Sequence, residues 1–268
     1  LDGNWGFGQV IAEKGMKMVI EKAKAHSISA VGLFHCNHIG RLGEYSLMAA
    51  EQDMIGIVVC NAGPPGGNTA PYGGRARRLS TDPISAAVPA WKSKPFLLDF
   101  ATSMVAEGKL RIKYYRGEKV PLGWIIDKEG RPTTDPKDFY EGGAILPFGG
   151  HKGYALSLLI DILGGALTGG GCVSSKEFVG GNGTLMIAIN ISSFTPLQEF
   201  KERTDALFEA IKETPTAMGF KEVLVPGEPE FRTEEKRLKE GIFVEEKTWQ
   251  DITKIAEELE LNLKEIMA

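Results

Sequence analysis

Hydrophobic positions in the N-terminal part of the chain switch between helical and strand spacing. Ala12, Met16, Val19 and Ala23 recur at helical spacing, which predicts a helix over residues 9–25 with one buried stripe. A second helix is expected at 42–51, and short apolar runs predict strands at 30–34, 55–60, 84–88 and 96–100. The order helix, strand, helix, strand suggests a strand–crossover–strand unit. In such units, loops after the carboxyl ends of strands usually carry the ligand groups.

The pattern becomes more helical after residue 103. The sequence predicts a helix at 104–115, turns with a small hairpin at 127–130 within 121–136, and a buried helix at 154–167. An apolar run at 184–191 suits a strand that is covered on both faces and belongs with the first sheet. Later helices are expected at 197–213 and 249–267, separated by Pro226–Pro229.

Two glycine-rich segments predict irregular backbone, the first a loop and the second a bend before a helix. Residues 61–74 are dominated by Gly, Pro and Asn, and predict a loop that lines a site. Between Phe148 and Leu156, Lys152 stands among glycines on a bend that leads into an apolar helix, and a fixed cation there suits an anionic small molecule. The alternative is a turn before a buried helix, with His151 and Lys152 merely solvated.

Composition narrows the class of protein. The 268 residues are 43% hydrophobic and 25% charged, which is ordinary for a globular chain and excludes disorder. The net charge of -4 provides no basic face for nucleic acid, and we interpret Arg75, Arg77 and Arg78 as a solvated loop. Residues 154–167 are shorter than the roughly 20 residues of a membrane span. Three separated cysteines and the lack of a signal pattern predict a cytoplasmic protein.

Familiar chemical motifs are absent or incomplete. The segment Gly6–Ile11 begins like a dinucleotide fingerprint but lacks the third glycine and a preceding strand, and no P-loop, nucleophile elbow or zinc-protease helix occurs. His35 and His38 have no carboxylate companion on their loop, so we expect no metal. We interpret His38 as an acid–base group, with a capping or hydrogen-bonded loop histidine as the alternative. Asp99 ends a strand, where it can bind ribose hydroxyls or cap a helix after Thr102.

Seven motifs then occur in one characteristic order: Asn37–Gly40, Ser80–Pro83, Asp99–Ser103, Pro121–Trp124, Pro132–Pro136, Gly150–Tyr154 and Pro226–Glu228. In this order they resemble the malate/L-lactate/L-sulfolactate dehydrogenase family over nearly the whole chain. That family also contains ureidoglycolate dehydrogenase, diketogulonate reductase and cyclic-imine reductases, and is unrelated to the Rossmann lactate dehydrogenases. The chain departs from the family pattern at Ser80 and Asp82, where Gly and Asn are usual, and in a longer stretch at 64–69.

The resemblance implies an α+β fold with a mixed, largely antiparallel, non-Rossmann sheet that binds cofactor, an inserted helical subdomain and a C-terminal helix. We predict a cofactor-binding domain from residues 1–103 and 176–230, and a helical subdomain from 104–175 and 231–268. The implied cofactor is NAD or NADP, bound in homodimers whose active sites lie near the subunit boundary. Motif matching assigns His38 to acid–base catalysis. It assigns cofactor binding to Asp99, Phe100, Ala101, Thr102, His151, Lys152, Pro226, Gly227 and Glu228.

The expected activity is hydride transfer between a nicotinamide cofactor and C2 of a small 2-hydroxy or 2-oxo acid. Two alternatives are reduction of a cyclic-imine carboxylate and a truncated, inactive cofactor-binding protein. The second arises because the family has an N-terminal helical segment, with a further histidine and a carboxylate-binding Arg, before the position of Asp2. On this basis the sequence predicts that the 268 residues alone bind cofactor weakly and lack activity, whereas a chain extended upstream forms an active dimer.

Overall fold

The computed structural model describes residues 1–266, and two compact units divide the chain at Gly227 and Glu228. The first unit contains α1 (Gly8–His26), β1 (Ile28–Leu33), α2 (Leu42–Ala50), β2 (Met54–Cys60), β3 (Ile84–Val88), β4 (Phe96–Phe100), α3 (Glu107–Tyr115), β5 (Ile125–Ile126), β6 (Pro132–Thr133), α4 (Pro136–Tyr140), β7 (Ala144–Ile145), α5 (His151–Asp161), β8 (Thr184–Asn190) and α6 (Leu197–Lys212). The second contains α7 (Glu228–Glu240), α8 (Glu246–Glu258) and α9 (Leu263–Ile266). This division does not test the predicted domains, which stay a prediction.

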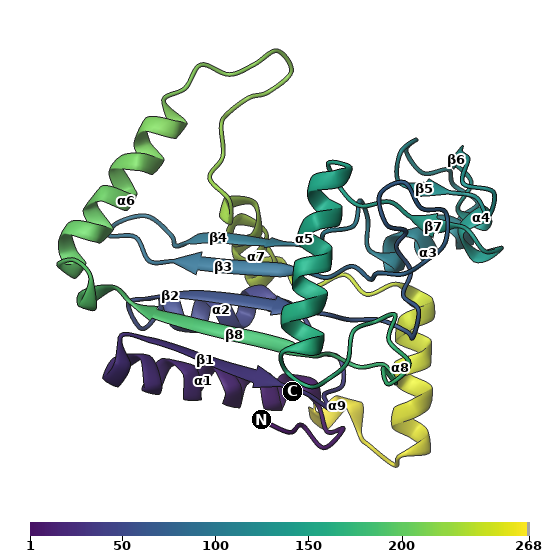
Figure 1. The fold of residues 1–268 in the computed structure, drawn as a ribbon, viewed down its shortest axis with the longest axis horizontal. Helices are drawn as coiled ribbons and strands as arrows, with labels where there is room; N and C mark the ends of the chain where they lie inside the picture. The colour runs from purple at the N-terminus through teal and green to yellow at the C-terminus, as the bar shows by residue number, and fades with distance from the viewer. Residues whose placement is uncertain (267–268) are drawn as a thin grey trace. The chain divides into compact units, whose positions relative to one another are not determined.

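A five-stranded sheet with the order β1-β8-β2-β3-β4 forms the centre of the first unit (Figure 1). Every neighbouring pair of strands is antiparallel, with Val31 opposite Met186 in β8 and Met186 opposite Val58 in β2. The predicted largely antiparallel α+β fold is therefore confirmed. Because β8 lies between β1 and β2, those two strands run in the same direction although they do not touch. The carboxyl ends of β1, β2 and β4 consequently meet at one edge of the sheet.

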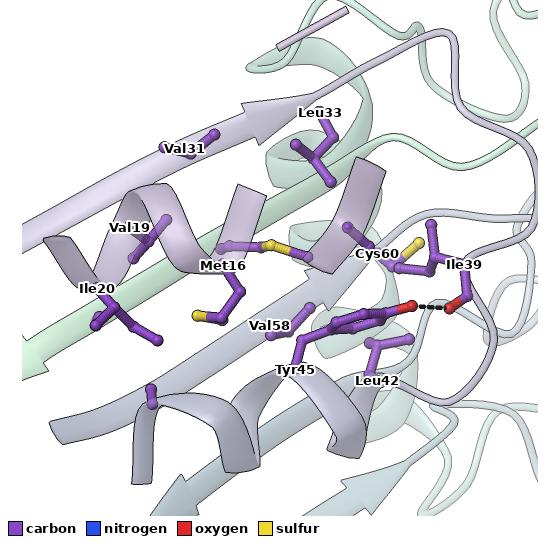
Figure 2. Packing of buried hydrophobic residues seen from close by; sticks show 14 of the residues in the cluster. Met16, Val19, Ile20, Val31, Leu33, Ile39, Leu42, Tyr45, Val58 and Cys60 are labelled. Carbon is purple, nitrogen blue, oxygen red and sulfur yellow. Dashed lines mark hydrogen bonds between the residues drawn. The ribbon is translucent and has the colours of Figure 1, made fainter. Parts of the chain in front are cut away.

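Alternating side chains give the sheet two apolar faces. On one face, α1 and α2 pack Met16, Val19 and Tyr45 against Val58 and other strand residues, as Figure 2 shows. The neighbours Val59 and Leu185 point to the opposite face, where they contact Ile160 of α5. The strands therefore have the period-two burial that a sheet covered by helices on both sides requires.

The helix predicted as buried over 154–167 is covered on one side only. α5 continues as a π-helix at Ile162–Ala166. On the side of α5 that faces the sheet, Ser157, Ile160 and Asp161 are buried. The other side exposes Leu158 (41%), Leu159 (50%) and Ile162 (47%). The predicted buried helix is therefore buried on one face only, because an apolar stretch does not reveal which of its faces a neighbour covers.

A smaller sheet, β6-β5-β7, packs with α3 and α4 around Leu110, Ile125, Phe139 and Ile145. The predicted hairpin is confirmed, since Gly130 closes the turn between β5 and β6. The predicted helix at 104–115 begins later, at Glu107.

In the second unit, α7 begins where the sequence predicted only a break. Pro229 is its second residue, and in the first turn of a helix the missing N–H of proline has no intrahelical partner to lose. The predicted helix at 249–267 is divided into α8 and α9, and its last residue, Met267, lies outside the described residues. Within residues 1–266, no helix combines the length and apolarity needed to cross a membrane.

Candidate active site

The predicted site residues gather at the edge of the sheet where β1, β2 and β4 end. His38 follows β1, the glycine-rich loop 61–74 follows β2, and Asp99 is the penultimate residue of β4; Figure 1 shows where these strands end. Although these segments are far apart in sequence, the antiparallel insertion of β8 brings them to a common edge. The sequence-based expectation that ligand groups lie at strand ends therefore has a structural basis.

His38 stands on a loop that the start of α1 holds in place. Asn37 donates its amide to the carbonyl oxygens of Trp5 (2.6 Å) and Gly6 (3.2 Å). Gly8, the first residue of α1, lies so close that a Cβ there would be 2.4 Å from the His38 carbonyl oxygen. Asn4, Trp5 and His35 all have positive φ. The segment before α1 and the segment after β1 therefore both carry backbone strain, which is common at functional sites.

The imidazole of His38 is exposed in a cavity of 460 Å³. The cavity, here called the His38 cavity, is lined by Trp5, Gly6, Phe7, Gly8, Gln9, Asn37 and His38, so the imidazole is its only titratable side chain among the described residues. The backbone N–H of Gly40 donates to Nδ1 of His38 at 3.0 Å. The neutral ring therefore carries its proton on Nε2 in this conformation.

Asp99 joins the His38 loop to the end of β4. Its Oδ2 accepts the backbone N–H of Gly43 at 2.9 Å, in the first turn of α2, and lies 3.6 Å from Nε of Arg41. A carboxylate at the start of a helix is stabilised by the free N–H groups and by the helix dipole. Asp99 does cap a helix, but the helix is α2 and not the one expected after Thr102. Its side chain remains 17% exposed, at the surface where a ligand would approach.

Phe100, Thr102 and the glycine-rich bend form the next part of the edge. The N–H of Phe148 donates to the carbonyl oxygen of Thr102 at 2.9 Å, and the Phe100 and Phe148 rings meet edge to face with centroids 5.4 Å apart. These contacts place Ala101 and Thr102 beside the bend that begins α5. The predicted residues Phe100, Ala101 and Thr102 are thus brought together with the segment that carries Lys152.

The bend turns through Gly149 and Gly150, which both have positive φ, and α5 starts at His151. The His151 ring lies edge to face with Tyr72 of the glycine-rich loop, at 5.9 Å between centroids. Lys152 is exposed and has no ion-pair partner among residues 1–266, and the first turn of α5 contains no acidic residue. A free cation at a helix start without a carboxylate suits a phosphate group, such as the diphosphate of a dinucleotide.

Pro226 lies alongside β4, because its carbonyl oxygen accepts the N–H of Leu97 at 3.0 Å. Pro226 and Gly227 thus run beside the strand that carries Asp99, whereas Glu228 belongs to the second unit.

Sequence reasoning did not single out Arg41 or Trp5. Their only signal in the sequence was that Trp5 is next to Gly6 and Arg41 is close to His38. In the fold, Trp5 lines the His38 cavity and Arg41 approaches Asp99.

Comparisons with known proteins show which family the chain resembles. A family model described as malate/L-lactate dehydrogenase matches residues 1–253. The chain belongs to this family. The malate dehydrogenase of Pyrococcus abyssi is 44% identical, over 96% of this chain and 73% of the relative.

Solved structures agree with this assignment. The sulfolactate dehydrogenase from Methanocaldococcus jannaschii superposes with a TM-score of 0.87 at 39% identity, over 98% of this chain and 76% of the other. The Δ1-piperideine-2-carboxylate reductase from Pseudomonas syringae pvar. tomato superposes with a TM-score of 0.82 at 26% identity, over 95% of this chain and 76% of the other. The relatives support a 2-hydroxy acid dehydrogenase that acts on a CH–OH group, and the family implies a nicotinamide cofactor.

Proposed function

We propose that this protein transfers a hydride between NAD or NADP and C2 of a small 2-hydroxy or 2-oxo acid of the malate, lactate or sulfolactate type. The observation that carries the proposal is the convergence of His38, Asp99 and the Lys152 bend at one edge of the sheet. The nicotinamide, when bound, supplies or accepts the hydride. A cytoplasmic location and a homodimer remain predictions, the second supported by the exposed apolar side of α5.

The cofactor-binding residues in this proposal are those that the motifs identify. Lys152 binds phosphate oxygens at the start of α5, and Asp99 presents a carboxylate near the ribose while it caps α2. Phe100, Ala101 and His151 line the path between them. Thr102 is fully buried and donates its hydroxyl to the carbonyl oxygen of Thr81 at 3.0 Å, so it supports this segment from within the fold. Pro226 accepts the N–H of Leu97 beside β4, and the motif match assigns Gly227 and Glu228 to the cofactor as well.

His38 exchanges the proton of the substrate hydroxyl. In the conformation observed, Nε2–H is a donor, so the ring can hydrogen-bond to the oxygen of a 2-oxo acid and polarise its carbonyl. To accept the hydroxyl proton on Nε2, the ring must carry its other proton on Nδ1, and the contact from Gly40 N–H must then open. Proton transfer is therefore coupled to a small movement of the 38–40 loop.

The likeness to a piperideine-carboxylate reductase favours a second candidate, reduction of a cyclic-imine carboxylate, because the same hydride geometry serves a C=N acceptor. A third candidate is an inactive cofactor-binding protein. A panel of 2-oxo acids and a cyclic-imine carboxylate, assayed with NADH and with NADPH, distinguishes the three.

Substitution of His38 tests the catalytic assignment. We expect His38→Asn to retain cofactor affinity but to lower turnover of the 2-hydroxy acid by roughly a hundredfold or more, as loss of a general acid–base group does. His26→Asn, at the exposed end of α1, is the matched control and should keep full turnover. Wild-type turnover in the His38 variant would assign the proton to another group.

A further inference from the structure

A second cavity, of 640 Å³, is lined in part by the Gly149–Gly150 bend, which precedes His151 and Lys152. Its walls include Tyr72, Arg75, Met104, Glu129 and Leu146. We call it the Arg75 cavity. The walls combine apolar side chains with glycine backbone, a combination suited to a small organic molecule that has at most a few polar groups.

The three neighbouring arginines, expected from sequence to be solvated together, have different roles. Arg77 is half-buried, donates Nε to the carbonyl oxygen of Gly143 at 2.7 Å and lies 4.2 Å over the Phe139 ring. Arg78 donates to the carbonyl oxygen of Arg77. Arg75 lines the cavity, and within residues 1–266 no carboxylate forms an ion pair with it. Arg77 therefore fastens the loop to the small sheet, while Arg75 keeps its donors available.

The position of Arg75 is set by the β5–β6 turn. Gly130 has φ +87°, and a Cβ there would lie 3.1 Å from Cβ and 3.9 Å from Cδ of Arg75, so the aliphatic stem of the arginine rests on the glycine. Asp127 holds this turn by accepting the N–H groups of Glu129 and Arg131, each at 2.9 Å. The contact with Gly130 restricts the stem of Arg75, so part of its side-chain entropy is already lost before the guanidinium binds a ligand.

Charge at the cavity favours an anion. Glu129 is the one carboxylate among the lining residues, and Nη2 of Arg131 lies 3.1 Å from its Oε2. The single negative charge of the lining is thus already paired, whereas Arg75 has no carboxylate partner among the described residues. The cavity therefore offers a guanidinium, whose planar donors match a carboxylate, sulfonate or phosphate.

We propose that Arg75 binds an anionic oxygen group of the small molecule that enters this cavity, and so determines specificity. The inference rests on the proposed function, which supplies two sources for such a group. One is the distal acid of the substrate, the second carboxylate of malate or the sulfonate of sulfolactate, which lactate lacks. The other is the 2′-phosphate that distinguishes NADP from NAD.

The test replaces Arg75 by Met, which keeps an apolar stem, and by Lys, with Arg78→Met as the matched control. Steady-state kinetics give kcat/KM for malate and for lactate, and fluorescence titration gives Kd for NADPH and for NADH. We expect Arg75→Met to lower either the malate-to-lactate ratio or the NADPH-to-NADH preference by about tenfold or more, because a charge-assisted hydrogen bond is lost. Arg75→Lys should restore part of the effect, and Arg78→Met should change neither ratio.

The two ratios identify the source, since the first reports the distal acid of the substrate and the second reports the 2′-phosphate. If both ratios stay within twofold of the wild type, or if Arg78→Met shifts them equally, the proposal is overturned. Should the wild-type protein turn over no hydroxy acid at all, the proposed function fails. Calorimetric binding of malate and of lactate, together with the NADPH and NADH titrations, then still decides the role of Arg75.

Discussion

Asp82 lies wholly buried under α5, in a position with positive φ. Its Oδ2 accepts the hydroxyl of Ser157 at 2.6 Å and the N–H of Ser80 at 3.2 Å, whereas Oδ1 has no hydrogen-bond partner. Burial, with a further contribution from the charge of Asp161, raises the pKa of Asp82 to about 7. This carboxyl group departs from the Asn that the family pattern favours, and it makes the stability of the fold depend on pH.

The sign of that dependence follows from the raised pKa. Between about pH 4 and pH 7 the folded protein keeps a proton that the unfolded chain releases, so this contribution to stability is complete at low pH and is lost as pH rises through 7. A shift of about three pKa units corresponds to on the order of 4 kcal/mol. We predict that Asp82→Asn, which cannot ionise, is more stable than the wild type above pH 7, by an amount that shrinks toward pH 4.

Urea unfolding of both proteins at pH 5 and pH 8 measures this difference in the free energy of unfolding. Ser93→Ala, at a turn outside the Asp82 environment, controls for nonspecific effects of substitution. A difference between wild type and Asp82→Asn that is equal at the two pH values would show that Asp82 does not titrate in this range.

Lys152 is the residue whose loss should most directly weaken cofactor binding. Because it stands unpaired at the start of α5, among the residues described, we predict that Lys152→Ala weakens NAD(P)H binding by about tenfold or more. Lys22→Ala, on the exposed side of α1, should have no effect. Fluorescence titration with reduced cofactor is the measurement, and unchanged affinity in the Lys152 variant would make the glycine-rich bend purely structural.

At the scale of elements, the start of α1 packs closely against the loop that carries His38. A Cβ on Gly8 would come within 2.2 Å of the Asn37 carbonyl oxygen, whereas a Cβ on Gly108, in α3, would meet nothing within 4 Å. We predict that Gly8→Ala displaces the His38 loop, lowers turnover and costs on the order of 2 kcal/mol of stability. Gly108→Ala should instead be neutral or stabilising, by up to about 1 kcal/mol.

Thermal unfolding and turnover of the two alanine variants provide the check. If Gly8→Ala and Gly108→Ala have equal stability and equal turnover, the contact between α1 and the loop has no role in placing His38. A Gly8 variant that loses stability but keeps turnover would separate the packing of α1 from the chemistry.

The sequence predicted most elements of the fold, but less about their neighbours. Periodicity located α1, β3, β4 and α6 to within a residue or two, because each buries one regular face. It did not reveal that β8, more than a hundred residues after β2, enters the sheet between β1 and β2, since strand order depends on long-range pairing. It also missed α7, where Phe231 and Leu238 stand among charged residues and are too few to predict a helix from an apolar stripe.

The candidate site was predicted from motifs more than from physical patterns. Asp99 had a physical signal of its own, a carboxylate at the end of an apolar strand. Its observed contact with the first turn of α2 depends on a pairing across the fold that no local pattern encodes. Arg75 was interpreted as one of three solvated arginines, because sequence cannot distinguish a guanidinium packed on Phe139 from one that lines a cavity.

At the scale of the whole molecule, we propose that one edge of the antiparallel sheet holds a nicotinamide cofactor, a 2-hydroxy acid and the histidine that exchanges its proton. The most direct test uses reduced cofactor labelled with deuterium at C4, oxaloacetate, pyruvate or sulfopyruvate as acceptor, and the protein expressed from its complete gene. Mass spectrometry then locates the label in the product.

We predict deuterium at C2 of the 2-hydroxy acid with the wild-type protein, and at least roughly a hundredfold slower labelling with His38→Asn at unchanged cofactor affinity. Labelling of a cyclic-imine carboxylate in place of all three acids would contradict the account and assign the sheet edge to imine reduction. Cofactor binding without transfer of label to any acceptor would contradict it as well, and would leave a binding protein.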